Sequence, residues 1–132
     1  MADINSVLSA IAADTTLTSW NPIVTALPEY ELKDTATAKC CVVPAGISYS
    51  NLSRGCVNKV FVVDVGFLKR KKNVGVLALI TEMETIAAHF MKASYANARV
   101  VEVTHDPLYD DERLRTENLF QAVLTLRLQE VS

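Results

Sequence analysis

The sequence predicts an α+β fold in which two helices pack on one mixed, mostly antiparallel sheet. Leu119–Val131 alternates apolar and polar side chains, and Val57–Leu68 is rich in valine and phenylalanine, as strands are. Asn73–Ala93 instead repeats apolar residues at three- and four-residue steps, as an amphipathic helix does. The resulting order, with strands on either side of a helix, is typical of an α+β domain.

Length and composition predict a single folded domain over residues 1–132. The chain lies within the usual range of about 100–200 residues per domain, and 50% of its residues are hydrophobic, which excludes a disordered chain. No apolar run approaches the ~18 residues of a membrane span. The formal net charge of -2 argues against nonspecific nucleic-acid binding by the whole surface. Because Met1–Asn5 lacks the features of a secretory signal, synthesis in the cytoplasm is expected.

The N-terminal elements are predicted from a helix cap and from prolines. Asp3 is a suitable N-cap for a short first helix. Pro22 and Pro28 disfavour a long helix over Leu17–Pro28, where an extended crossing segment is expected. The apolar face of the first helix comprises Ile4, Val7, Leu8 and Ile11.

The middle of the chain is predicted to form strands joined by a long loop. Glu29–Asp34 and Lys39–Val43 are strand candidates, and Pro44 is expected to close the second. Ala45–Gly55 is polar and contains two glycines, so a long loop is expected there. The strand Val57–Leu68 that follows is largely apolar on both faces, so both faces need cover.

Cover for the two faces of this strand has alternative sources. Two helices cover one face each only if they pack on opposite sides of the sheet, and the first helix is too short to cover a whole face. The remaining cover comes either from Leu17–Pro28 or from another copy of the protein.

The C-terminal half continues with a helix and two strands. Asn73 is a natural cap for the second helix, and Arg99–His105 is a strand candidate with Val101 and Val103 on one face. Asp106–Glu112 is predicted to be an acidic turn. The apolar stripe of the helix comprises Val76, Leu79, Ile80, Met83, Ala87, Phe90 and Met91.

Cysteine usage predicts neither a disulfide framework nor a metal site. The three cysteines are an odd number, and no C-x-x-C pair is present. We interpret Cys40, Cys41 and Cys56 as small buried hydrophobic residues in a reducing compartment. No metal and no cofactor are predicted.

One group of residues keeps a catalytic alternative open. His105 and Asp106 could form the acid–base pair of a small hydrolase, with Cys56 as the nucleophile. The same His-Asp pair equally fits a strand that ends in a turn capped by the aspartate. His89 is expected beside the apolar stripe of its helix. We predict that the protein is not an enzyme and has no catalytic residues.

Two charged clusters are candidate binding surfaces. The acidic cluster has no turn glycine of a calcium loop and suits contact with a protein partner, which makes an adaptor a further alternative. The basic run suits phosphate, although no aromatic platform accompanies it. Solvated loops are the other interpretation of both. The acidic cluster comprises Asp106, Asp110, Asp111 and Glu112, with Arg113 and Arg115 nearby, and the basic run comprises Lys69, Arg70, Lys71 and Lys72.

The order of elements over nearly the whole chain resembles the tail terminator and tail-completion (head–tail joining) proteins of long-tailed bacteriophages. The resemblance begins with a short amphipathic helix and a strand pair. The other segments that carry it are the polar stretch Ala45–Gly55, the strand Val57–Leu68, the helix Asn73–Ala93, the strands Arg99–His105 and Leu119–Val131, and the phrase Val101–Pro107.

The resemblance implies a structural virion protein in viral tail assembly. Such proteins form a ring, typically a hexameric ring, that caps the tail tube, ends its polymerisation and joins it to the head connector. The implied partners are further copies of the chain, the tail tube protein, the head connector or neck protein and, transiently, passing DNA, but no membrane. The implied location is the virion tail or neck, after synthesis in the host cytoplasm. Another neck or head-completion protein is an alternative of similar build.

The ring model also implies where contacts fall. Loops exposed at the two ring faces are the natural interfaces, and a basic ring could guide DNA through the lumen. The candidate interface residues are Ile47, Tyr49, Asn51, Arg54, Asp110, Asp111, Glu112 and Arg113. The candidate lumen or DNA-facing residues are Lys69, Arg70, Lys71 and Lys72.

Overall fold

The computed structural model describes residues 3–25, 39–53, 56–70, 76–105 and 119–131. The elements are α1 (Ile4–Ala12), the 3-10 helix η1 (Thr15–Trp20), β1 (Pro22–Val24), β2 (Lys39–Ser53), β3 (Cys56–Arg70), α2 (Val76–Phe90), β4 (Ser94–Tyr95), β5 (Ala98–Thr104) and β6 (Leu119–Val131). The strands form one sheet in the order β1-β2-β3-β6-β5-β4. Since β1 pairs parallel with β2 and every other pair is antiparallel, the predicted α+β fold with a mixed, mostly antiparallel sheet is confirmed.

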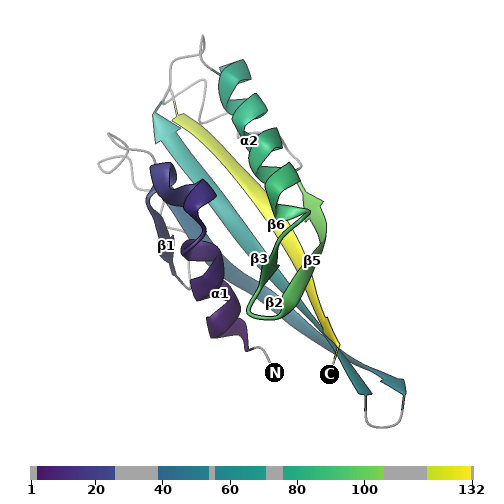
Figure 1. Cartoon of the computed structure of the whole chain (residues 1–132). Coiled ribbons are helices and arrows are strands. Elements are labelled where there is room, and N and C mark those ends of the chain that lie inside the picture. The colour runs from purple at the N-terminus through teal and green to yellow at the C-terminus, as the bar shows by residue number, and fades with distance from the viewer. Residues whose placement is uncertain (1–2, 26–38, 54–55, 71–75, 106–118, 132) are drawn as a thin grey trace.

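Both helices lie on the same face of the sheet (Figure 1). Alternate residues of β3 and β6 point to that face and meet the apolar stripes of α1 and α2 in one core. The two helices therefore do not cover one face of the sheet each. The largest fully buried side chains of this core include Trp20, Phe61, Phe67, Phe90 and Phe120.

The opposite face of the sheet is a mixed polar and apolar surface where β3 and β6 pair. The Thr125 hydroxyl donates to Asp64 Oδ1 at 2.8 Å, and the Gln129 side-chain amide donates to Asn58 Oδ1 at 2.8 Å. Half-buried valines lie among these polar pairs. The valines are Val60, Val62 and Val123.

Aspartate caps set the two N-terminal helices. Asp3 caps α1 as predicted, because its Oδ1 accepts a 2.7 Å hydrogen bond from the Ser6 N–H. The expectation of an extended segment from Leu17 onward is wrong at its start, where Thr15–Trp20 form η1. Leu17 and Trp20 are three residues apart, so the 3-10 repeat turns both into the core.

The largest correction concerns the loop expected at Ala45–Gly55, because Ala45–Ser53 belongs to a strand. β2 runs through Pro44 to Ser53 and pairs with β3 along this length. One of the two register shifts in the pair lies between Pro44 and Gly46, where the ladder absorbs the proline on an edge strand. Beyond it, Ile47 and Tyr49 alternate with serines, a pattern with a period of two that is typical of a strand.

The second half of the chain follows the prediction with local differences. The strand expected at Arg99–His105 runs from Ala98 to Thr104, and the short β4 before it was not expected. A register shift between Val100 and Glu102 separates Val101 from the face of Val103, so the expectation that they share a face is wrong. Met91 was expected in the apolar stripe of the second helix, but it lies just after the end of α2 and is 46% exposed.

Three of the expected local elements fall outside the described residues. These are the strand Glu29–Asp34, the cap Asn73 and the acidic turn Asp106–Glu112.

Candidate functional site

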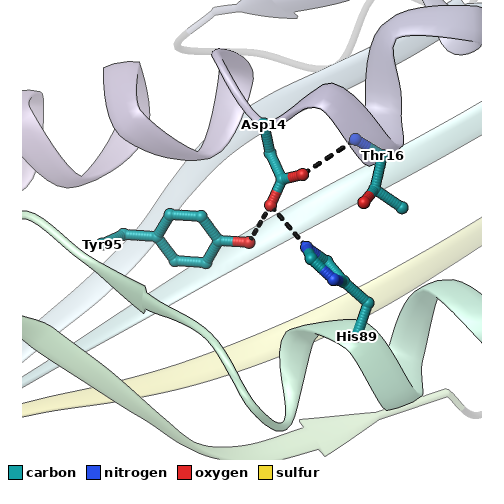
Figure 2. A network of polar contacts seen from close by, with 4 residues as sticks. All are labelled: Asp14, Thr16, His89 and Tyr95. Atoms are coloured by element: carbon teal, nitrogen blue, oxygen red, sulfur yellow. Dashed lines mark hydrogen bonds and ion pairs between the residues drawn. The ribbon is translucent and has the colours of Figure 1, made fainter.

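A hydrogen-bonded cluster around Asp14 joins η1 to α2 and β4, as Figure 2 shows. Asp14 is the N-cap of η1, and its Oδ1 accepts a hydrogen bond from the Thr16 N–H at 2.9 Å. Its Oδ2 accepts a hydrogen bond from the Tyr95 hydroxyl at 2.6 Å and lies 2.8 Å from Nε2 of His89. We call Asp14, Thr16, His89 and Tyr95 the clasp.

The clasp is built on a carboxylate that is largely shielded from water. The Asp14 side chain is 10% exposed, and burial on its own raises the pKa of a carboxyl group. Hydrogen bonds from Tyr95, His89 and Thr16 outweigh burial, so the pKa of Asp14 lies below its ordinary value of 3.8. Burial and the neighbouring carboxylate raise the pKa of Tyr95. Asp14 is therefore ionised at neutral pH, and Tyr95 keeps its proton.

The geometry of the clasp suits a structural role. Asp14 lies 75 residues from His89 and 81 from Tyr95 in the sequence, so the bonds join distant parts of the chain. The Tyr95 side chain is buried and directs its hydroxyl to Asp14. His89, expected beside an apolar stripe, instead extends from the exposed side of α2 to this carboxylate. The clasp thus holds η1 in place against α2 and the end of the sheet.

β2 and β3 continue past the helices as a projecting hairpin, and β6 accompanies β3 along it as far as the Asn58–Val131 pair (Figure 1). We call this hairpin the arm and define it as Pro44–Ser53 of β2 with Cys56–Val60 of β3. Each residue from Pro44 to Asn51 is exposed. β1 pairs with β2 only at Cys40–Val42, so within the described segments no strand pairs with the outer edge of the arm.

The helix side of the arm carries apolar and aromatic side chains. Lys59 Nζ lies 5.5 Å from the ring centroid of Tyr49 and 5.0 Å from that of Phe61, within the range of cation–π attraction. Across the hairpin, Tyr49 is opposite Lys59 and Ile47 is opposite Phe61. Tyr49 is still 65% exposed, so the arm presents a large aromatic side chain to the surroundings.

Exposed large apolar side chains lie at separate positions near two opposite edges of the sheet. One group lies on β1 and the arm, and the other lies on β5 and around α2, which packs on β5 and β6. Each side of the sheet therefore offers exposed apolar side chains for contact with another protein. The first group is Ile23, Val24, Ile47 and Tyr49, and the second is Leu77, Met91 and Val101.

The candidate interface residues divide into a described and an undescribed set. Ile47, Tyr49 and Asn51 all lie on the arm, a strand rather than the expected loop. The others lie outside the described residues, and their interface role stays a prediction. These are Arg54, Asp110, Asp111, Glu112 and Arg113.

Among the candidate DNA-facing residues, Lys69 has a described side chain. It is half-buried opposite Phe120 on the helix side of β3, and its Nζ lies 5.7 Å from the ring centroid of Trp20. The Trp20 indole N–H in turn donates to Glu82 Oε1 at 2.9 Å. Lys69 therefore packs beside η1. The side chain of Arg70 is not described, and Lys71 and Lys72 lie outside the described residues.

The structure describes only part of the catalytic alternative. His105 follows β5 and is half-buried, whereas Asp106 and the side chain of Cys56 lie outside what is described. Cys40 and Cys41 are buried free thiols, which confirms their interpretation as buried residues. Burial, with a smaller effect from Cys41, raises the pKa of the Cys40 thiol to about 12 and makes it a poor nucleophile.

Neither a membrane-spanning helix nor a cluster of metal-ligating side chains occurs in the described segments. None of their helices is long and apolar enough to cross a membrane. No group of three or more His, Cys, Asp and Glu side chains among them is placed to hold a metal ion.

Comparison with known proteins finds a solved structure with a similar fold. No protein-family model matches the chain, and no curated protein matches it. A chain in the solved structure of the virion of a native gene transfer agent (GTA) particle matches with a TM-score of 0.53. The match covers 97% of this chain and 93% of that chain, at 12% sequence identity. The two chains therefore share a fold over nearly their whole lengths.

Proposed function

We propose that the protein is a structural component of a phage-like virion. Its fold is similar to that of a chain in a gene transfer agent virion over nearly the full length of both. More specifically, it forms a closed ring, of six copies, that caps the tail tube, ends tube polymerisation and joins the tube to the head connector. This role agrees with the resemblance of the sequence to tail terminator and tail-completion proteins.

The observation that carries the ring proposal is the presence of different exposed apolar side chains near opposite edges of the sheet. A closed ring needs a head-to-tail interface in which one surface of each copy contacts a different surface of the next. The β1–arm edge offers Ile47 and Tyr49, and the β5 edge offers Val101 beside α2. Since these surfaces lie on opposite sides of one rigid sheet, each copy can contact two neighbours at once.

In the assembled virion the DNA passes through the lumen of this ring. Lys69 packs over Trp20, so we assign guidance of the DNA to Arg70, Lys71 and Lys72 in the adjoining basic run. In the sequence Arg70 is the last residue of β3 and Lys71 and Lys72 come directly after it, whereas the other end of β3 forms the arm. The role is structural, and the protein acts by assembly rather than by catalysis.

A tube-length experiment tests the proposal. The cognate tail tube protein is polymerised with and without this protein, and tube lengths are measured by electron microscopy. The protein is expected to stop growth and to remain at one tube end as a ring. Tubes of unchanged length without the protein at their ends would contradict the capping role, and binding to the head connector alone would favour a neck or head-completion protein.

A further inference from the structure

We propose that the outer edge of the arm pairs with the β5 edge of the next copy, so that the sheets of neighbouring subunits join by main-chain hydrogen bonds. This inference rests on the proposed ring and specifies which strands form its interface. The occupant of the arm edge is therefore a second copy of this chain.

The outer edge of the arm has the features of an unpaired edge strand that can pair with another chain. From Pro44 to Ser53 its backbone pairs with β3 on one side, and every residue from Pro44 to Asn51 is exposed. The sequence Ala45–Ser53 contains no charged residue. Proteins normally protect such edges with charges, prolines or a covering segment, because an open edge recruits other strands. Past Pro44, the arm has none of these protections in its described residues.

β5 supplies the matching edge at the other side of the sheet. It pairs with β4 only at Ala98 and Arg99, and with β6 on its other side. The stretch from Val101 to Thr104 therefore has a free outer edge within the described segments. Val101 lies at the register shift and is 44% exposed, which places an apolar side chain at this edge.

The two faces of the proposed joint also match. On the helix side, Ile47 and Tyr49 of the arm would lie beside Val103, which packs against the core. On the opposite side, the hydroxyls of Ser48 and Ser50 would face β5 residues that are also polar. These polar residues are Glu102 and Thr104. Apolar residues thus meet apolar ones, and hydroxyls meet a carboxylate and a hydroxyl, whichever direction the two strands take.

Hydrogen exchange of the assembled ring tests the pairing directly. In an antiparallel hairpin alternate amides point to the outer edge, and these exchange rapidly until another strand covers them. We expect exchange in both Ala45–Ser53 and Val101–Thr104 to slow at least about tenfold on assembly. Protection of the arm alone, or of neither segment, in a ring that forms would overturn this inference and leave the ring proposal in place. Failure to form any ring would overturn both.

Added charges give an independent test with a matched control. Lysine on an edge strand blocks pairing with another chain, so Ser48→Lys and Thr104→Lys should each raise the concentration at which rings form by about tenfold or more. Ser9→Lys makes the same change on the exposed side of α1 and should not alter assembly. Circular dichroism confirms that each variant is folded. Normal assembly of folded Ser48→Lys and Thr104→Lys would overturn the inference.

Discussion

Replacing Asp14 with alanine is expected to destabilise the fold more than any other single change at a helix cap. The Asp14 carboxylate caps η1 and also accepts hydrogen bonds from Tyr95 and His89, at 2.6 and 2.8 Å. Alanine removes the cap and leaves the hydroxyl of the buried Tyr95 without its partner. The variant tests whether the clasp holds η1 against α2.

The expected magnitude follows from these bonds. Loss of an N-cap carboxylate costs about 1 kcal/mol, and a buried hydroxyl left unsatisfied costs about 1–3 kcal/mol. The contact with His89 adds little, because that side chain is 42% exposed and solvent weakens the pair. The free energy of unfolding should therefore fall by about 2–4 kcal/mol, which corresponds to roughly 10 °C in the melting temperature of a domain of this size.

Thermal and urea unfolding followed by circular dichroism measure this change. Asp3→Ala is the matched control, because Asp3 is also an N-cap carboxylate but is exposed and bonds only near its own helix. The double variant with Tyr95→Phe should lose much less than the sum of the two single changes, since both remove the same bond. Equal losses for Asp14→Ala and Asp3→Ala, or additive losses in the double variant, would refute the clasp.

Three further predictions concern pH, the core and the cysteines. The pKa of Asp14 is lower in the folded state than its ordinary value, so the stabilisation from its carboxylate is complete above the ordinary pKa of 3.8 and is lost as pH falls through the folded-state pKa. In urea titrations, the free energies of unfolding of wild type and Asp14→Asn should therefore converge at acid pH. Phe67→Ala removes a fully buried ring that meets Trp20 edge-on at a centroid distance of 5.2 Å, and should cost about 3–5 kcal/mol in urea unfolding. Tyr49→Ala on the exposed arm removes only a solvent-exposed contact with Lys59 and should cost at most about 1 kcal/mol. Cys40 should resist alkylation at pH 8 until the protein is unfolded, as read by mass spectrometry; rapid labelling of the native protein would contradict its burial.

Elements set by local chemistry could be predicted from the sequence. The Asp3 cap and the apolar stripe of α1 depend on residues within a few positions of one another, and both are confirmed. The alternation of apolar and polar residues in β6 likewise predicted which of its faces is buried, because the side-chain period of a strand is two. In β6 that face comprises Phe120, Ala122, Leu124, Leu126 and Leu128.

The arm was missed because two local signals disagreed. Pro44, Gly46 and the serines predict a loop, whereas the alternation of Ile47 and Tyr49 with serine predicts a strand. Pairing with the long, apolar β3 decides in favour of the strand, and the register shift after Pro44 makes that pairing possible. Tertiary contact with a partner strand is not visible within the segment itself.

The clasp could not be predicted from the sequence for a different reason. Asp14, His89 and Tyr95 lie far apart in the chain, and no spacing rule connects them. Asp14 follows Ile11, the last residue of the apolar stripe of α1, by three positions, and that position does not point to His89 or Tyr95. The contact requires that α1 and α2 pack on the same face of the sheet, which periodicity within each helix does not determine.

Single-particle electron microscopy of the purified protein, with and without the tail tube protein, tests the central claim most directly. The account predicts closed rings of identical subunits, with the arm of each copy at the β5 edge of the next, and loss of these rings in Ser48→Lys. Isolated monomers under both conditions, or open filaments that never close, would contradict it.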